Sequence, residues 1–576
     1  MNTQRIIVSD LAQVTALKTL SEHCRPGRLD WDFGQPDQVS LPPEAAKMEN
    51  GRLISLTLSK KDIKPQSRKV NFLAPALEGG FEIRLKINGA SIPKASGPTR
   101  GHDKNTVTDP AEVAALKSFY EANSFKNSHM DWVFTNTGSV YGNGLKVKDG
   151  HLDTLVAIGL GIKDLRPLAA LTHLASLDLC GNKVRDLRPL SHLTKLRNLC
   201  LHYNEIQKLS GLEYLVHLRT LSLNNKISDL RPLATLIKLQ ELSLSYDEVS
   251  DYSPLLNLKS LKRLYLSGDN IKDLTPLGNL SKLKCLVNLD LQHTDISDLG
   301  PLSSLTNLTE LDLHCTEAKD LTPLAELKNL KTLNVDNPDI KDIKPLASIN
   351  SLIYIDIWGV SIRDLSPLAK LRNLESLGLI ATRIKDPTPL AEFKSLTYLD
   401  LSYNKLRDIS PLSSLTCLAE LRLDNTKTND LTPLASLANL TRLSLANNKI
   451  SDLSPLAGLT ALTRLDLANN KISDLAPLAD LTYLTELKLA SHLGANKKIS
   501  DLAPLARLTN LESLFMGQTM VSDLSPLYAL TSMRWLDLAS KQIKDLRPLL
   551  SIKFKRDAII SIKKNQAGIN IKIPGR

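Results

Sequence analysis

One leucine-rich pattern recurs along most of the 576-residue chain. Residues 174–190 and 440–456 both follow the template LxxLxLxxNxIxDLxPL, with the apolar positions and the proline at the same spacing. Most steps between successive prolines, from Pro167 to Pro548, span about 22 residues. A chain of this length usually divides into several cores, but a repeat of this period grows in one dimension instead. The pattern therefore predicts a solenoid of about 18 turns.

Each position of the template has a structural reason. The LxL segment is a short strand whose two leucines point into the core, while the residue between them faces solvent. The asparagine can bond to backbone groups in the bend that follows, and the proline fixes φ on the opposite side, where no ladder hydrogen bond is needed. We therefore expect an α/β leucine-rich repeat solenoid, a curved right-handed array. It would have a parallel concave β-sheet, short 3-10 or irregular convex segments and a helical N-terminal cap.

The repeats at 448–456 and 470–478, both of the form NKISDLxPL, resemble those of the internalin-like bacterial leucine-rich repeat family. The resemblance covers about residues 155–550. It implies the solenoid fold and, for function, only that such arrays usually bind proteins. In the middle of the array the asparagine position is replaced, and we expect a weaker side-chain ladder there. The replacing residues are Asp247, Asp269, Thr294, Thr316, Pro338, Val360 and Thr382.

Residues 1–150 contain a second duplication. Segment 10–20 matches 109–119, and segment 50–53 matches 149–152. In each copy we expect an amphipathic helix that begins at an aspartate N-cap and leads to a first repeat-like strand. The expected parts are a small cap-like module at 1–90 with irregular turns at 56–58 and 85–87, a linker at 91–108, a second capping unit at 109–154, the repeat array at 155–550 and basic C-terminal cap strands at 551–576.

The net charge of +11 comes from the two ends of the chain. Residues 1–108 carry 16 Lys and Arg against 11 Asp and Glu, and residues 552–576 carry 7 against 1. Lysines on a terminal strand discourage edge-to-edge pairing, so we interpret the basic C-terminal segment as a cap. Binding of an anionic surface or nucleic acid through the basic ends is the third-ranked hypothesis for function.

The chain shows no targeting or membrane signal. It has no apolar N-terminal run with a cleavage site, no apolar stretch of about 18 residues and no wall-sorting motif, so we expect a cytoplasmic protein without membrane association. The cysteines stand singly and form no CxxC pair, and we expect reduced thiols that act as small half-buried fillers. They are Cys24, Cys180, Cys200, Cys285, Cys315 and Cys417.

No catalytic motif accompanies the repeats. The patterns HExxH, GxxxxGK[ST] and GxSxG are absent, and we expect neither an enzyme nor a cofactor. One polar cluster invites a metal hypothesis, because its members project from adjacent strands: Asp290, His293, Asp312, His314 and Cys315. Aspartate between the two leucines is common in these repeats, so we favour a metal-free solvated face.

The same concave surface carries scarce aromatic residues. Tyr354, Asp356 and Trp358 share one strand, Ile380 lies on the next, and Tyr398 begins the one after. Clustered Trp and Tyr are typical of interface hot spots. In the C-terminal repeats, by contrast, the equivalent position after the LxL segment carries only small apolar side chains: Ala446, Ala468, Ala490 and Ala539.

These features predict a non-catalytic scaffold that binds a protein or peptide on its concave face, centred on residues 290–425. The alternative is an adhesin or exported effector of internalin type that binds a host protein. The predicted partner-binding residues are Asp290, His293, Asp312, His314, Tyr354, Asp356, Trp358, Tyr398, Asp400 and Tyr403.

Overall fold

The computed structural model describes residues 106–538 except 124–131, 135–139, 142–143, 246–248, 269–270, 272–273, 275–281, 407, 492–493, 497 and 518, and in addition residue 543 and the strands given below. The chain divides into two compact units. One comprises Met1–Thr106 with Lys126–Val133, and the other comprises Val107–Phe125 with Phe134–Arg576.

The first unit contains two small sheets. One has the strand order β1-β3-β2 and the other the order β4-β5-β6-β7. Strands β5 and β6 run parallel, with Leu56 paired with Ile83 and Leu58 paired with Leu85. The strands are β1 (Ile6–Val8), β2 (Asp32–Gln35), β3 (Gln38–Leu41), β4 (Ala46–Glu49), β5 (Arg52–Ser59), β6 (Glu82–Ile87) and β7 (Ala90–Ser91).

The two segments that match in sequence also pair their strands in a similar way. In the first copy Ala46 pairs with Leu56, and in the second Leu145 pairs with Leu155, 99 residues further on in both strands. Both hairpins have a register shift at the corresponding step. The pair of Val8 with Val39 likewise has its counterpart in the bridge between Val107 and Val140. The helix expected at 10–20 lies outside the described residues.

Helix α3 (Pro110–Ala122) begins the second unit as predicted. The Oδ1 of Asp109 accepts hydrogen bonds from the backbone N–H of Ala111 at 2.9 Å and of Glu112 at 3.0 Å. Leu116 and Phe119 lie on its buried face. At the other end, Asn123 accepts hydrogen bonds from the N–H groups of residues 163 and 164, which attaches the helix to the first repeat.

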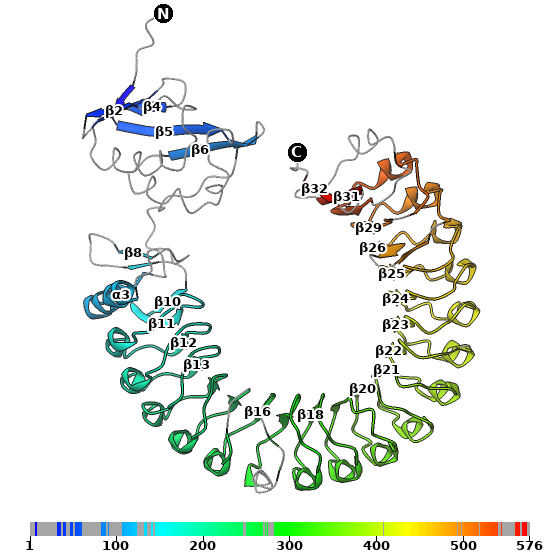
Figure 1. Ribbon diagram of the computed structural model, residues 1–576, viewed down its shortest axis with the longest axis horizontal. Coiled ribbons are helices and arrows are strands. Elements are labelled where there is room, and N and C mark those ends of the chain that lie inside the picture. The colour runs from blue at the N-terminus through cyan, green and yellow to red at the C-terminus, as the bar shows by residue number, and fades with distance from the viewer. Residues whose placement is uncertain are drawn as a thin grey trace, which may run out of the picture. The chain divides into compact units, whose positions relative to one another are not determined.

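The repeats build one 21-stranded sheet, counted over the described strands, which lines the inner side of an open arc (Figure 1). From β11 to β31 the paired strands run parallel, and β10 and β32 close the two ends antiparallel. The sheet strands are β10 (Leu145–Lys148), β11 (His151–Val156), β12 (Ser176–Asp178), β13 (Asn198–Cys200), β14 (Thr220–Ser222), β15 (Glu241–Ser243), β16 (Arg263–Tyr265), β17 (Asn288–Asp290), β18 (Glu310–Leu313), β19 (Thr332–Val335), β20 (Tyr354–Trp358), β21 (Ser376–Ile380), β22 (Tyr398–Asp400), β23 (Glu420–Arg422), β24 (Arg442–Ser444), β25 (Arg464–Asp466), β26 (Glu486–Lys488), β29 (Ser513–Phe515), β30 (Trp535–Asp537), β31 (Ile559–Lys564) and β32 (Ala567–Lys572).

Two short pairs stand outside this sheet: β8 (Val133–Phe134) with β9 (Val140–Tyr141), and β27 (Ala490–Ser491) with β28 (Gly494–Ala495). The convex side of each turn is a short 3-10 segment that begins near the proline of the template. The 3-10 segments are η3 (Arg166–Ala170), η4 (Arg188–His192), η5 (Leu212–Tyr214), η6 (Arg231–Thr235), η7 (Ser253–Asn257), η9 (Gly300–Ser304), η10 (Thr322–Glu326), η11 (Lys344–Ser348), η12 (Leu368–Lys370), η13 (Thr388–Glu392), η14 (Ser410–Ser414), η15 (Thr432–Leu434), η16 (Ser454–Leu456), η17 (Ala476–Leu478), η18 (Ala503–Arg507) and η19 (Ser525–Ala529).

Leucines fill the space between the sheet and these turns. The two strand leucines of one repeat, Leu399 and Leu401, are both fully buried. The bend after each strand differs along the array as predicted. Asn404 donates to the carbonyls of both its own turn and the preceding one, at 2.9 and 2.6 Å. Thr316 in the middle donates to the Leu313 carbonyl of its own turn at 2.9 Å. The ladder is therefore weaker there, although the sheet itself continues without a break.

Two middle repeats replace the ladder in other ways. Buried Val360 fills the asparagine position with an apolar side chain. In the neighbouring repeat the position belongs to Pro338, and buried Asn337 donates instead to the Thr316 carbonyl at 3.1 Å. Asp247 and Asp269 lie outside the described residues.

Candidate protein-binding face

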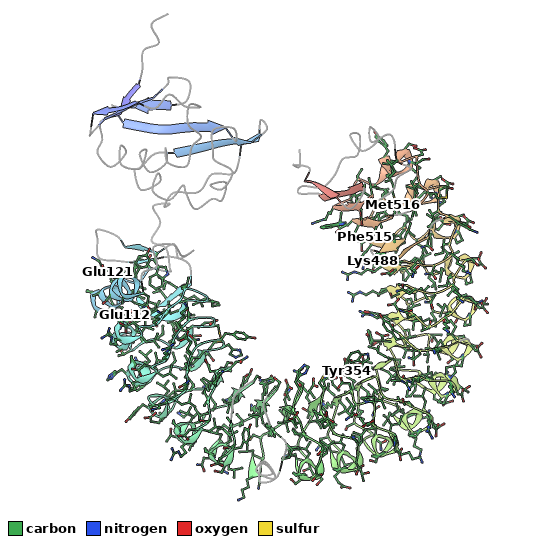
Figure 2. All side chains as sticks on the ribbon, in the orientation of Figure 1. Glu112, Glu121, Tyr354, Lys488, Phe515 and Met516 are labelled. Atoms are coloured by element: carbon green, nitrogen blue, oxygen red, sulfur yellow. A yellow bond between two sulfur atoms is a disulfide. The ribbon has the colours of Figure 1, made fainter. Side chains whose placement is uncertain are left out.

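The concave sheet presents three columns of solvent-facing positions, one before, one between and one after the two strand leucines. The register of the parallel strands stacks equivalent positions directly, so Asp312, Asn334 and Asp356 are consecutive members of the middle column. Tyr354 belongs to the first column and points to the inner side of the arc (Figure 2). Buried and more exposed residues alternate along β20, whereas on β21 and β22 the middle-column residues Gly378 and Asp400 are buried as well.

Trp358 and His314 place two aromatic rings together on this face. Trp358 is 47% exposed, and its ring stacks at 6.1 Å, centroid to centroid, on the imidazole of His314 two strands away. Asp336 lies on the strand between them, with its Oδ2 at 3.4 Å from the Nε2 of His314. The sequence-based prediction included both aromatic residues but not Asp336. This aspartate lies one 22-residue step after His314 and one such step before Trp358.

Asp356 carries an unsatisfied carboxylate oxygen at the centre of the face. Within the described part of the chain, its buried Oδ1 has no hydrogen-bond partner. A Cβ added at Gly378 on the next strand would collide with this oxygen, so the glycine leaves the space that the carboxylate fills. Burial raises the pKa of Asp356, and the carboxylates of Asp400 and Asp312 raise it further, while His314 lowers it.

Asp290 lies at the N-terminal end of the predicted face and is better satisfied. Its two carboxylate oxygens accept hydrogen bonds from the backbone N–H and the side-chain amide of Gln292, both at 2.9 Å. Burial nevertheless raises its pKa, and the neighbouring Asp312 carboxylate contributes in the same direction. The middle column therefore holds several carboxylates that partial burial makes costly to ionise.

Tyr398 and Asp400 extend the face to β22. The Tyr398 hydroxyl lies 3.5 Å from the Oδ2 of Asp400, and the guanidinium of Arg422 lies 5.7 Å from the centre of the tyrosine ring. Burial and the Asp400 carboxylate raise the pKa of Tyr398 well above its usual range. Tyr403 is 60% exposed and stands beyond the strand, at the left-handed φ of 61°.

His293 and Cys315 occupy the same left-handed position beyond their own strands, with φ of 59° and 54°. Both are exposed at the edge of the face and not on its floor. The ligand atoms of the predicted polar cluster do not gather. Among the residues that the structure describes, the groups with such atoms within 4.8 Å are two others, Glu112 with His151 and His173, and Asp178 with Cys180 and Cys200.

The charge of the face changes sharply after β22. The solvent-facing positions of β17 to β22 include six carboxylates and neither lysine nor arginine. On the next strands opposite charges pair: Glu420 lies 2.7 Å from Arg422 and 3.2 Å from Arg442, and Lys488 lies 2.9 Å from Glu486. The predicted alanine column is present and buried at Ala446, Ala468 and Ala490, whereas Ala539 lies outside the described residues.

The sequence-based prediction of a C-terminal column without binding features rested on the alanines alone and did not include this ion-pair network. The sequence signals the network through side chains of both charges, which recur at 22-residue steps in the other two columns. The paired side chains line a shallow pocket of about 260 Å³. Since its charges largely neutralise each other, this third of the face offers less to a charged partner than the centre does.

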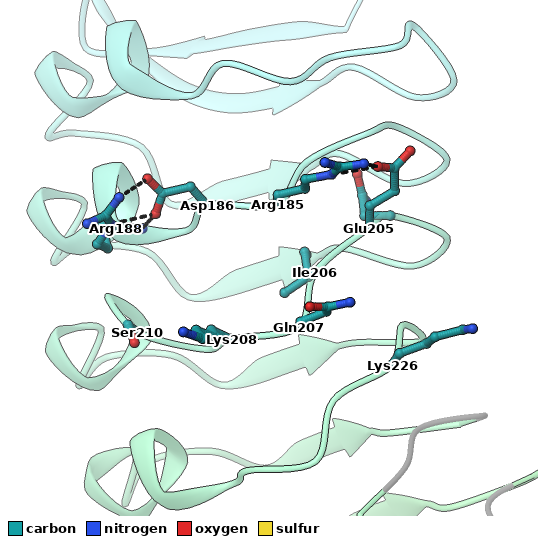
Figure 3. A pocket seen from close by; sticks show the side chains of 10 residues that line it. Arg185, Asp186, Arg188, Glu205, Ile206, Gln207, Lys208, Ser210 and Lys226 are labelled. Atoms are coloured by element: carbon teal, nitrogen blue, oxygen red, sulfur yellow. Dashed lines mark hydrogen bonds and ion pairs between the residues drawn. The ribbon is translucent and has the colours of Figure 1, made fainter.

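A separate hollow of about 830 Å³ lies on the flank of the early repeats (Figure 3). It is next to Gly211, which replaces the template proline and packs against the backbone of Arg188. Two of its cations are already paired, Arg188 with Asp186 at 2.8 Å and Arg185 with Glu205. The hollow is open, its lining residues are polar or charged apart from Ile206, and it contains none of the aromatic residues of the concave face.

The cysteines differ from the prediction. Cys180 and Cys200 form a disulfide across adjacent turns, with 5.9 Å between their Cα atoms, so the prediction of reduced thiols is wrong for this pair. The two positions are diagonal neighbours on β12 and β13, which a search for CxxC spacing cannot detect. Cys285, Cys315 and Cys417 are free thiols as predicted, but they are exposed and not half-buried. Cys24 lies outside the described residues.

Comparison with known proteins agrees with this geometry. A model of two consecutive leucine-rich repeats matches residues 194–235, 286–326, 394–436, 438–480 and 461–507. The chain is 32% identical to internalin C2 of Listeria monocytogenes, over 40% of this chain and 82% of that one, with a TM-score of 0.24. The chain is an internalin-like leucine-rich repeat protein.

Other solved structures are similar to parts of this leucine-rich repeat protein. The internalin InlF of Listeria monocytogenes is 28% identical over 70% of this chain and 96% of that one, with a TM-score of 0.37. A leucine-rich repeat protein of Leptospira interrogans is 21% identical over 70% and 95%, with a TM-score of 0.47. No curated protein matches the sequence. In the described part of the chain, no helix has both the length and the apolar character needed to cross a membrane.

Proposed function

We propose that this leucine-rich repeat protein is a non-catalytic scaffold that holds a basic segment of another protein against the concave face between β17 and β22. The observation that carries the proposal is the surface around Asp356. There a carboxylate oxygen that has no hydrogen-bond partner among the described residues lies between exposed Trp358 and half-buried Tyr354. Leucine-rich repeat folds generally serve as protein-binding scaffolds, and this face differs in composition from the rest of its own sheet.

The charge distribution supports a cationic partner. The three columns of the face from β17 to β22 hold six carboxylates, partly or largely buried in several cases, and neither a lysine nor an arginine. Burial is the main cause that raises the pKa of Asp290 and Asp356, and the neighbouring carboxylates raise it further. A lysine or arginine side chain from a partner would relieve this repulsion, and it would gain charge-assisted hydrogen bonds with Asp356.

The aromatic side chains supply apolar anchors beside these charges. Trp358 and His314 present a stacked pair of rings, and a guanidinium can stack on such a surface. Tyr354 and Tyr398 occupy the first column of the same face with a serine between them. Buried aromatic anchors surrounded by neutral contacts are the usual arrangement of an interface hot spot.

A pull-down from native lysate tests the site. We expect the triple variant Tyr354→Ala, Trp358→Ala and Tyr403→Ala to lose partner capture, each anchor contributing about 1–4 kcal/mol. The backbone should accept alanine at 403, because Ala381 has the same left-handed conformation one turn earlier. The matched control changes Ala446, Ala468 and Ala490 to serine. Undiminished capture by the aromatic variant, at an equal melting temperature, would move the site elsewhere.

An adhesin or exported effector of internalin type would use the same surface on a host protein, and we keep it as the second proposal. The disulfide between Cys180 and Cys200 favours an oxidising compartment over the cytoplasm expected from the sequence. Fractionation of the producing cells, with antibody against the purified chain, distinguishes the two. Protein confined to the cytosol in reduced form would contradict export.

A further inference from the structure

Three side chains from three separate elements meet where the capping helix joins the first repeats. Glu112 comes from the first turn of α3, His151 from the start of β11, and His173 from the turn between η3 and β12. The Nδ1 atoms of the two histidines lie 3.3 and 3.4 Å from the same carboxylate oxygen, Oε1 of Glu112. Figure 2 shows Glu112 on α3 at the N-terminal end of the array.

Glu112 is held in place by burial and by the backbone. Its side chain is only 3% exposed, and its second oxygen, Oε2, accepts a hydrogen bond from the N–H of Leu152 at 2.8 Å. The oxygen Oε1 is therefore left to face the two imidazoles. A buried carboxylate is costly unless a cation or several donors compensate its charge.

The two imidazole rings are stacked on each other. Their centroids lie 3.9 Å apart at an interplanar angle of 22°. The two Nδ1 atoms and Oε1 of Glu112 therefore lie close together. A divalent cation compensates the carboxylate and binds the lone pairs of both neutral rings at once.

The spacing of the ligand atoms fits such an ion. In a tetrahedral zinc site, bonds of about 2.0–2.1 Å place neighbouring ligand atoms about 3.3–3.4 Å apart. The distances from Oε1 of Glu112 to both Nδ1 atoms lie in this range. The side chains of His151 and His173 are 36% and 40% exposed, which leaves a path for the ion to enter.

The duplicated capping unit provides an internal comparison. The positions of Glu112 and His151 correspond, 99 residues earlier, to Gln13 and Arg52. An arginine cannot ligate a metal, and a neutral amide is a weak ligand for zinc. The first copy of the capping unit therefore lacks the two ligands that the second copy has. The second copy is the one that precedes the long repeat array in the chain.

We propose that Glu112, His151 and His173 bind one zinc ion, with a water molecule in the fourth position. The ion fastens the first turn of α3 to β11 and to the first convex turn, and so stabilises the N-terminal cap. The other compact group, Asp178 with Cys180 and Cys200, carries no such proposal because its two sulfur atoms form the disulfide.

The test uses the full chain without a histidine tag, stripped with a chelator and titrated calorimetrically with zinc chloride. We expect one equivalent to bind and the melting temperature to rise with free zinc. Glu112→Gln keeps an acceptor for Leu152 and copies the residue of the first capping unit. This variant and His173→Ala should each weaken zinc binding by at least about 100-fold. His217→Ala, an exposed histidine at the same repeat position two turns later, is the matched control and should bind as wild type.

Cobalt substitution separates this site from the free thiols. We expect the visible absorption of a tetrahedral cobalt ion without a thiolate-to-metal charge-transfer band. Wild-type protein that binds no zinc would overturn the proposal. The proposal would also be overturned if the cobalt spectrum showed a thiolate band and the Glu112→Gln and His173→Ala variants bound zinc as tightly as wild type. Circular dichroism would first confirm that both variants are folded.

Discussion

The carboxylate of Asp356 occupies the space that a side chain at Gly378 would fill on the neighbouring strand. This relationship keeps a partly buried negative charge on the floor of the concave face, with one oxygen unsatisfied within the described structure. Such a charge lowers the stability of the free protein, and it favours a partner that brings a positive charge.

Asp356→Asn should therefore stabilise the fold and weaken partner binding. The folded-state pKa of Asp356 is raised, so its ionised form opposes folding at neutral pH, and stability is regained as pH falls through that pKa. The amide removes this charge, and we expect an increase of about 1 kcal/mol in unfolding free energy. Urea unfolding at pH 7 measures it. A less stable variant with normal binding would show that the charge has a structural role.

Removing the disulfide should destabilise the N-terminal third. The bond closes a loop with a sequence separation of 20 residues, and loops of this size contribute roughly 3 kcal/mol. We expect the variant with Cys180→Ser and Cys200→Ser to melt at a lower temperature. Wild type with added reductant should match it. Mass spectrometry under denaturing conditions gives the decisive check. A disulfide lowers the mass of the wild-type protein by two hydrogen atoms, and a wild-type mass without this decrease would contradict the bond.

Truncation of a strand leucine tests the packing of the array. Leu401 is fully buried, and each such leucine supports its own turn and the two adjacent turns. Leu401→Ala should cost roughly 2–5 kcal/mol through the cavity that it leaves. The half-exposed control Ser376→Ala on a neighbouring strand should change stability little. If Leu401→Asp melted at the wild-type temperature, the assignment of buried and exposed strand positions would be incorrect.

Aspartates in the convex turns should make the free energy of unfolding decrease at acid pH. Asp430 and Asp452 each accept a hydrogen bond from the backbone N–H two residues later, at 2.9 and 2.8 Å. Hydrogen bonds from Thr432 and Ser454 lower the pKa of these carboxyls below 3.8. Their contribution is present above pH 3.8 and is lost as pH falls through the lowered folded-state pKa.

The double variant Asp430→Asn and Asp452→Asn should therefore lose less stability than wild type as pH is lowered below about 4. Melting temperatures between neutral and strongly acid pH measure the difference. Parallel curves for the two proteins would mean that these turns do not contribute to acid unfolding.

Much of the fold was predictable because one local pattern repeats. Each LxL segment specifies a strand, and a 22-residue step stacks it on the next, so the sheet and its inward leucines follow from the sequence. The N-cap at Asp109 was equally local, since one side chain satisfies the first N–H groups of α3. We also predict that residues 109–576 fold alone, because they carry their own capping unit.

The disulfide escaped the sequence because it joins diagonal neighbours in the sheet. Cys180 and Cys200 differ by 20 residues and not 22, and they meet only because side chains lean across adjacent turns. Asp336 stands one 22-residue step after His314, so the repeat itself places the two residues side by side, and it was missed because the prediction considered mainly aromatic side chains. Thr316 shows what its position could and could not predict. A threonine in place of asparagine predicted a weaker side-chain ladder, but it did not predict that the β-sheet continues unchanged past this repeat.

Selection of binding peptides tests the central claim most directly. A random peptide library is panned on the immobilised wild-type protein, and the selected peptides are measured against the Asp356→Asn variant and the aromatic triple variant. We predict peptides rich in lysine and arginine beside apolar residues, with at least about 10-fold weaker binding to both variants and to wild type at high salt. Peptides without a basic bias, or basic peptides that bind both variants as tightly as wild type, would contradict a binding site on the acidic, aromatic centre of the concave face.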